Sequence, residues 1–295
     1  CGYGPQKGEK MKKFILGLLS LLLLTGCSLS TRKEDIKVYT TYYPIQYFTD
    51  YLYGKYGDIE SIYPSQADIN NYELTDKQKS IYSKGDIFIY TGIKKEIDLA
   101  VDLLNKNEEL RISDATKGLN YKNDISELWL DPSNALMIAR NIKSNLEDYD
   151  ENVYNRNYIE SQYEELKIKI SELDVELTLM GKNASRKTIL VNDDSLNFLS
   201  KYNVKVLSVD NDSEDYTKNL NEAKALISSG DIKYIFKTTG STYNEEITNI
   251  INSYKLEELE IETMYTLTED ERKDSEDYLT IMDNNITKFK TELFR

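Results

Sequence analysis

In the middle of the chain, apolar residues recur alternately four and three positions apart. They are Ile159, Tyr163, Leu166, Ile170, Leu173, Leu177 and Met180, and Glu and Lys occupy many of the intervening positions. This spacing predicts an amphipathic helix from about Glu151 to Met180 that ends at Gly181 and is roughly 45 Å long. The stripe suits either a coiled-coil dimer or, as we favour, a rigid spine packed along two lobes.

Short runs of β-branched and aromatic residues alternate with helical segments on both sides of this helix. We expect strands at 36–41, 58–63, 86–90, 188–191, 204–209, 232–236 and 259–265. Strands separated by helices imply parallel sheets with crossover helices. The sequence therefore predicts an α/β protein with two similar lobes of mainly parallel sheet, joined by one long spine helix.

The N-terminal region has the pattern of a secretory signal that begins at Met11. Lys12 and Lys13 precede an apolar run at 14–24, which is too short to span a bilayer, although a single-pass anchor is the alternative reading. The letters "LTGC" then resemble a bacterial lipobox, which implies lipidation of Cys27. Two acyl chains on this cysteine would anchor the protein stably to a membrane.

These patterns divide the chain into six parts. We expect 1–10 to be an upstream artefact, because "KGEK" could be encoded by a purine-rich ribosome-binding site, 11–26 a lipoprotein signal peptide, 27–35 a lipid-anchored tether, 36–150 the N-terminal α/β lobe, 151–182 the linking helix, and 183–295 the C-terminal α/β lobe.

Composition narrows the chemistry that the protein can perform. The chain has no histidine, and removal of the signal peptide leaves Cys27 as its one thiol. Because no imidazole or free thiol can pair with a hydroxyl or carboxylate, we do not expect an enzyme. The 37 Lys and Arg against 51 Asp and Glu also argue against nucleic acid as a partner.

Four sequence blocks carry a resemblance to a known family. They are "VYTTYYPIQYFTDYLYG", "DINNYELTDKQKSIYSKGDIFIYTG", "ELWLDPSNALMIARNI" and "DYLTIMDNNITKFK". With the central helix, they make the chain resemble the solute-binding lipoproteins of bacterial zinc and manganese ABC importers. The resemblance implies the two-lobed fold with a helical backbone, a monomer on the outer face of the cytoplasmic membrane, and a membrane permease as partner.

The resemblance also places the family's metal ligands on particular residues. Its histidine positions fall on Asn70, Glu127 and Asp193, and its last acidic position falls on Leu267 in an uncertain alignment. Asp68, Asp194 and Asp124 are possible additional donors. Oxygen ligands suit manganese, calcium or magnesium, and would bind zinc weakly. Asn and Asp also close turns and cap helices, so these residues can have purely local roles.

The leading interpretation is a lipid-anchored receptor that binds a metal ion and delivers it to a permease. Two alternatives keep the fold and change the role. Tyr42, Tyr43 and Tyr72 could line a pocket for a small organic molecule instead. The protein could also be a surface adhesin or scaffold whose cleft binds nothing.

Overall fold

The computed structural model describes residues 36–295 except for residues 70, 122, 123 and 214, and the described residues from Ile36 onward form one compact unit. The predictions for 1–35, which include the lipidated Cys27, lie outside the described residues, as does the candidate ligand Asn70. Within the described part, no helix is apolar over a long enough stretch to cross a membrane.

A parallel sheet forms the centre of the N-terminal lobe. Its strands are β1 (Ile36–Thr40), β2 (Gly57–Ser61), β3 (Ile87–Tyr90) and β4 (Arg111–Asp114), in the order β2-β1-β3-β4. The helices of this lobe are α2 (Tyr43–Tyr53), α3 (Asp76–Tyr82), α4 (Lys94–Lys106), α5 (Glu127–Leu130) and α6 (Pro132–Tyr149). The sequence pattern does not indicate β4, whose "RISD" contains one large apolar residue, Ile112.

The C-terminal lobe repeats the same sheet topology. Its strands are β5 (Thr188–Val191), β6 (Lys205–Ser208), β7 (Tyr234–Thr238) and β8 (Glu257–Ile261), all parallel, in the order β6-β5-β7-β8. The other elements are the 3-10 helix η1 (Asn197–Tyr202) and the helices α8 (Tyr216–Ser228), α9 (Glu245–Tyr254), α10 (Glu269–Lys273) and α11 (Tyr278–Leu293). The prediction of two similar α/β lobes is therefore confirmed.

The last strand ends earlier than the sequence pattern suggested. β8 stops at Ile261, whereas the alternating pattern predicted a strand as far as Tyr265. Met264 has a φ of 59°, in the left-handed region, which is incompatible with a strand. The residues after Ile261 therefore leave the sheet and become available to line a site.

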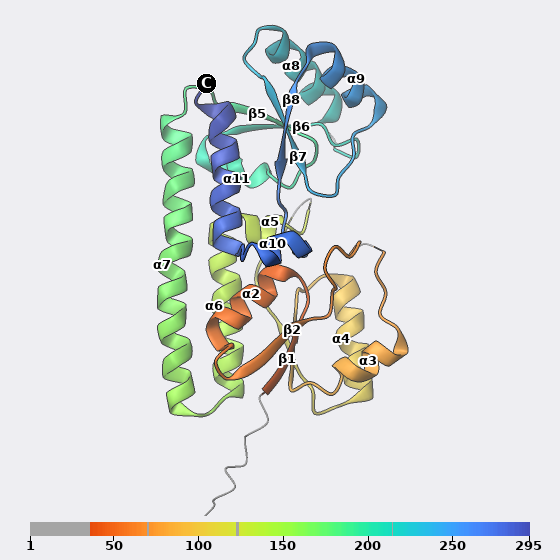
Figure 1. The fold of residues 1–295 in the computed structure, drawn as a ribbon, viewed down its shortest axis with the longest axis vertical. Helices are drawn as coiled ribbons and strands as arrows, with labels where there is room; N and C mark the ends of the chain where they lie inside the picture. The colour runs from red at the N-terminus through yellow and green to blue at the C-terminus, as the bar shows by residue number, and fades with distance from the viewer. Residues whose placement is uncertain (1–35, 70, 122–123, 214) are drawn as a thin grey trace, which may run out of the picture. The chain divides into compact units, whose positions relative to one another are not determined.

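The spine helix α7 runs from Val153 to Asn183 and lies alongside α6 and α11 (Figure 1). Asn152 caps its N-terminus through a hydrogen bond from the Tyr154 amide. Its apolar stripe is buried within the same chain, as the spine interpretation predicted: the buried residues include Ile159, Leu166, Ile170, Leu173, Leu177 and Met180.

Gly181 has a different role from the predicted one. The helix continues two residues beyond it, so it is not the terminator that the sequence suggested. A Cβ atom built at Gly181 would lie 1.6 Å from the carbonyl oxygen of Tyr202 in η1. Glycine is required here because α7 and the backbone of the C-terminal lobe approach each other closely.

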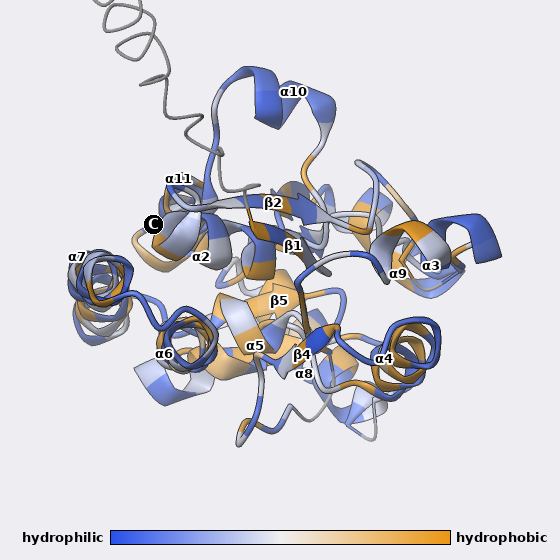
Figure 2. Cartoon of the chain, turned by 90° about the horizontal axis from the view of Figure 1, so that it is seen from below, coloured by the Kyte–Doolittle hydropathy of each residue, from blue (hydrophilic) through white to orange (hydrophobic). Residues whose placement is uncertain are grey.

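One continuous apolar core connects the two sheets through the spine. Its largest fully buried side chains include Trp129, Tyr278, Phe88 and Phe236, which come from both halves of the chain. Figure 2 shows that β5 is largely hydrophobic and that α10 is largely hydrophilic. A second apolar cluster lies under α8 and α9 in the C-terminal lobe.

Candidate functional site

A cavity of about 520 Å³ lies between the two lobes, beyond the C-terminal ends of strands from both sheets. Its described lining consists of Tyr42, Gln66, Ala67, Asp68, Ile69 and Ile125 from the N-terminal lobe and Thr239, Gly240, Glu262, Thr263, Tyr265, Thr266 and Thr268 from the C-terminal lobe. Open parallel sheets bind their ligands at this edge. We therefore take this cleft cavity as the candidate site.

The segment 262–268, which follows β8, is bound to the N-terminal lobe by hydrogen bonds. The indole Nε1 of Trp129 donates to the carbonyl oxygen of Thr263 at 2.7 Å. The backbone amide of Gln66 donates to Oγ1 of Thr266 at 3.1 Å. These contacts fix the two walls of the cleft cavity against each other.

Two non-glycine residues at the cleft have left-handed backbone conformations. Gln66 and Met264 both have a φ of 59°. For a buried long side chain such as Met264, which is 0% exposed, this conformation costs on the order of 1 kcal/mol. The surrounding contacts must hold it in place, and such strained residues concentrate at binding sites.

Glu262 is the partly buried carboxylate in the wall of the cavity. Its Oε1 accepts a hydrogen bond from the Met264 amide at 2.9 Å, and its Oε2 accepts one from Oγ1 of Thr239 at 2.7 Å. Its own amide donates to Oδ1 of Asn285 in α11 at 3.1 Å. Burial raises the pKa of Glu262 to about 7, and the neighbouring Glu271 adds to this shift.

Glu262 was not among the site residues predicted from the sequence. The pattern "LEIETMY" placed it in the middle of a strand, where alternation assigns it to a solvent-facing position. Its actual position is the first residue after β8. A signal existed, because an acidic residue just beyond a strand of a parallel sheet lies at the ligand-binding edge.

Aromatic rings from both lobes also line the cavity. The ring centroid of Tyr42 lies 5.8 Å from that of Tyr265 and 5.1 Å from that of Trp129. The hydroxyl of Tyr265 donates to Oδ1 of Asp124 at 2.6 Å. Burial raises the pKa values of Tyr42 and Tyr265 far above the ordinary value, so both phenols are neutral near pH 7.

A second buried carboxylate, Glu96, supports these rings from behind. Its Oε2 accepts from the amide and the hydroxyl of Thr91 at 2.7 and 2.6 Å. Its Oε1 accepts from the hydroxyl of Tyr63 at 3.2 Å, and the ring of Tyr63 packs on Tyr42. Glu96 is 0% exposed, and burial raises its pKa to about 7.

Asp68 lines the cleft cavity, whereas the carboxylate of Asp193 is hydrogen-bonded within its own turn and to Thr238 of β7. Oδ2 of Asp68 accepts from the side-chain amide of Asn71 at 2.7 Å. Asp193 accepts from the amide of Ser195 at 2.9 Å and from the hydroxyls of Ser195 and Thr238. Burial raises the pKa of Asp193. These contacts match the turn-closing role that the sequence left open for this aspartate.

The other candidate ligands lie elsewhere. Glu127 lines a hollow of about 550 Å³ beside Asn197, and Asp194 lines an adjoining one of about 490 Å³. Leu267 is buried in the core. Among residues whose positions the structure describes, no three Asp, Glu or Cys side chains are close enough together to hold a metal ion.

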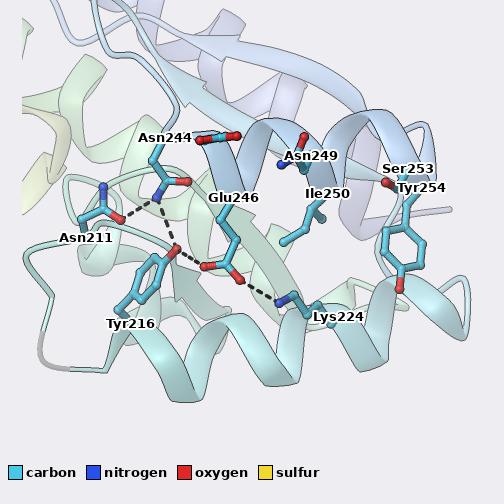
Figure 3. Close-up of a pocket in the computed structure, with 10 residues that line it drawn as sticks. Asn211, Tyr216, Lys224, Asn244, Glu246, Asn249, Ile250, Ser253 and Tyr254 are labelled. Atoms are coloured by element: carbon cyan, nitrogen blue, oxygen red, sulfur yellow. Dashed lines mark hydrogen bonds and ion pairs between the residues drawn. The ribbon is translucent and has the colours of Figure 1, made fainter.

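A further hollow of about 700 Å³ lies between α8 and α9 (Figure 3). The side-chain amide of Asn244 donates to Asn211 at 2.5 Å, the hydroxyl of Tyr216 donates to Glu246 at 3.1 Å, and Lys224 pairs with Glu246 at 2.9 Å. These polar groups satisfy one another at the protein surface, so we do not take this hollow as the principal site.

Comparison with known proteins gives a family match along most of the chain. Residues 38–292 match the family described as "Zinc-uptake complex component A periplasmic". Residues 11–28 match the pattern described as "Prokaryotic membrane lipoprotein lipid attachment site".

The chain also resembles individual proteins. It is 22% identical over 319 residues to the zinc-binding protein AdcA of Streptococcus pyogenes serotype M6, with 94% of this chain but only 61% of that protein covered. It is 22% identical over 306 residues to the high-affinity zinc uptake system protein ZnuA of Bacillus subtilis, with 92% and 94% covered.

Solved structures share the fold. The metal-dependent lipoprotein YcdH from Bacillus subtilis has a TM-score of 0.74 and 21% identity, covering 88% of this chain and 100% of that one. The Zn(II)-bound ZnuA-like domain of Streptococcus pneumoniae AdcA has a TM-score of 0.73 and 19% identity, with the same coverage. At these identities the likeness concerns the fold alone.

Proposed function

Because the chain belongs to the zinc-uptake complex component A family, we propose that it is the extracytoplasmic solute-binding lipoprotein of an ABC importer. The match to a lipid attachment site supports a location on the outer face of the cytoplasmic membrane, and we infer that Cys27 carries the lipid anchor. The observation that carries the proposal is the cavity between the lobes, which the C-terminal ends of strands from both sheets surround.

The solute of this receptor is a cation. Asp68 from the N-terminal lobe and Glu262 from the C-terminal lobe are both among the residues that line the cavity, and the chain has a formal net charge of −14. Such a charge raises the local concentration of cations near the cleft. The relatives are named for zinc, so divalent metals are the first cations to test, with hard ions such as manganese favoured by oxygen donors.

Delivery requires the permease to distinguish the loaded protein from the empty one. The spine helix α7 packs against both lobes and resists large hinge motions. The segment 262–268 both lines the cavity and bonds to the N-terminal lobe. Ligand binding would therefore change the surface around this segment, and the monomer would present that change to the permease.

Thermal unfolding of the chelator-treated protein tests metal binding. Zinc, manganese, calcium, magnesium and iron are each added, and a metal at 100 times its Kd stabilises the fold by about 2.7 kcal/mol. Repeating the series on Glu127→Ala and Asp193→Ala tests the ligands proposed by position; a shift that persists in both variants overturns that assignment.

The receptor role has a separate test that needs no knowledge of the ligand. Cells displaying the full-length lipoprotein are treated with a cross-linker, and the products are identified by mass spectrometry. An ABC permease subunit among the products is the expected result. The positive control is another lipoprotein of the same cells that cross-links to its own permease. If this control succeeds and the products of the protein contain no permease subunit, the proposal is overturned.

A further inference from the structure

We propose that the solute in the cleft cavity is a small organic cation with an ammonium or guanidinium group, not a bare metal ion. The proposal rests on the receptor function above and specifies its ligand class. Three features of the cavity carry it: its volume, the charge of its described lining, and the chemistry of its walls.

The volume suits an organic molecule. Cavities of roughly 300–1,000 Å³ are typical of small-molecule sites, and this one measures about 520 Å³. A dehydrated metal ion with its direct ligands would fill a small part of that space. A bare divalent ion needs several oxygen ligands directed at one point, and the Asp, Glu and Cys side chains that the structure describes form no group of three.

The charge of the described lining calls for a positive ligand. Glu262 contributes a carboxylate, and no lysine or arginine is among the lining residues that the structure describes. The nearby carboxylates of Glu260 and Glu271 act on Glu262 in the same direction, because both raise its pKa. A cation in the cavity would relieve this repulsion, which an anionic or neutral solute could not do.

The orientation of Glu262 matches a nitrogen head group. The Met264 amide donates a hydrogen bond to Oε1 of Glu262, and the Thr239 hydroxyl donates one to Oε2. A carboxylate has about four acceptor positions, so each oxygen retains a further one. An ammonium or guanidinium group can donate two N–H bonds to such a pair, and charge-assisted bonds of this kind are the strong ones.

The aromatic wall accommodates the rest of the molecule. Tyr42 and Tyr265 line the cavity, and the ring of Trp129 packs behind both, with its centroid 5.1 and 5.7 Å from theirs. Ring faces attract organic cations and pack against methylene groups. Neutral phenols are poor metal ligands, which again separates the two ligand classes.

The test measures binding to the full-length protein in detergent. The chain contains a single tryptophan, Trp129, so its fluorescence reports on the cavity. The probes are putrescine, spermidine, agmatine, arginine and choline, each at concentrations up to the millimolar range, with 1,4-butanediol and citrulline as neutral counterparts of putrescine and arginine. Zinc, manganese and calcium chlorides are titrated separately after chelator treatment, and calorimetry confirms each saturable signal.

We expect at least one organic cation to bind saturably while the neutral counterparts do not. Glu262→Gln should weaken that binding at least tenfold, and Glu258→Gln, an exposed position on β8 outside the cavity, should leave it within twofold. The wild-type comparison of cations with neutral counterparts decides the question even if Glu262→Gln does not fold.

Two results would overturn this inference. One is binding by a metal ion alone, with Glu262→Gln abolishing it; this result would leave the receptor function intact. The other is the absence of any saturable signal from the organic cations, confirmed by calorimetry. Failure of the receptor function itself would appear independently, as cross-linking products without a permease subunit.

Discussion

Glu96→Gln should make the protein more stable near pH 8 and less sensitive to pH. The folded protein raises the pKa of Glu96 from 4.5 to about 7, chiefly through burial. The unfolded chain therefore ionises this carboxyl at a lower pH than the folded chain does. The contribution of Glu96 to the free energy of unfolding is fully present below pH 4.5 and is lost as the pH rises through 7. At about 1.4 kcal/mol per pH unit, the loss amounts to about 3 kcal/mol.

Glutamine preserves most of the local geometry while it removes the charge. Its oxygen can still accept from the amide and hydroxyl of Thr91, and the hydroxyl of Tyr63 can rotate to accept from the new amide. Most of the buried-charge cost at pH 8 should therefore disappear without a large loss of hydrogen bonds.

Denaturant unfolding of both proteins at half-unit steps from pH 4 to pH 8.5 measures the effect. The difference between the two curves isolates Glu96, because the other titrating groups are common to both proteins. This difference should grow by about 3 kcal/mol in favour of the variant between pH 4.5 and pH 8. A constant difference across the range would show that Glu96 titrates normally, which would refute its burial as an isolated acid.

Other variants examine different parts of the structure. Gly181→Ala should destabilise the fold by about 3 kcal/mol in urea unfolding, because overpacking against Tyr202 outweighs the gain in helix propensity; unchanged stability would contradict the close approach. Trp129→Phe should cost about 3 kcal/mol by circular dichroism, because the Thr263 carbonyl loses its buried donor. Cys27→Ala should move the protein from the membrane fraction to the soluble fraction and abolish labelling by radioactive palmitate. Cation binding should weaken about tenfold from pH 8 to pH 6, because protonation competes for the Glu262 carboxylate, whose pKa is about 7; titration calorimetry should show no such change in Glu262→Gln.

The fold could be predicted where a regular spacing of apolar residues coincided with the secondary-structure propensity of the same segment. The apolar repeat from Ile159 to Met180 forms the predicted helix because its residues, except the half-buried Tyr163, are buried against the same chain. The strand at β4 could not be found, since Arg111–Asp114 gives no alternation and is held by pairing with β3. Gly181 was ambiguous, because helix termination and close packing both select glycine.

The site was less predictable because side-chain direction depends on tertiary contacts. The sequence correctly predicted that Asp193 follows β5. It could not show that Ser195 and Thr238 would donate hydrogen bonds to the Asp193 carboxylate. Position likewise gave no sign that Glu127 lines a separate hollow. Glu262 was hidden because the left-handed turn at Met264 interrupts a pattern that reads as continuous strand.

The ligand class that we propose implies that one fold can retain a binding edge while the ligand changes. The backbone places strand ends around the cavity whatever residues follow them, so the edge itself depends on the sheets and on α7. The chemistry depends on a few residues just beyond those strands, here Tyr42 after β1 and Glu262 after β8. In a chain without histidine, these residues present one carboxylate against an aromatic wall, which selects ligands by charge and size and not by nitrogen coordination. Family membership therefore identifies the transport role, whereas the ligand must be inferred from the residues that line the cavity.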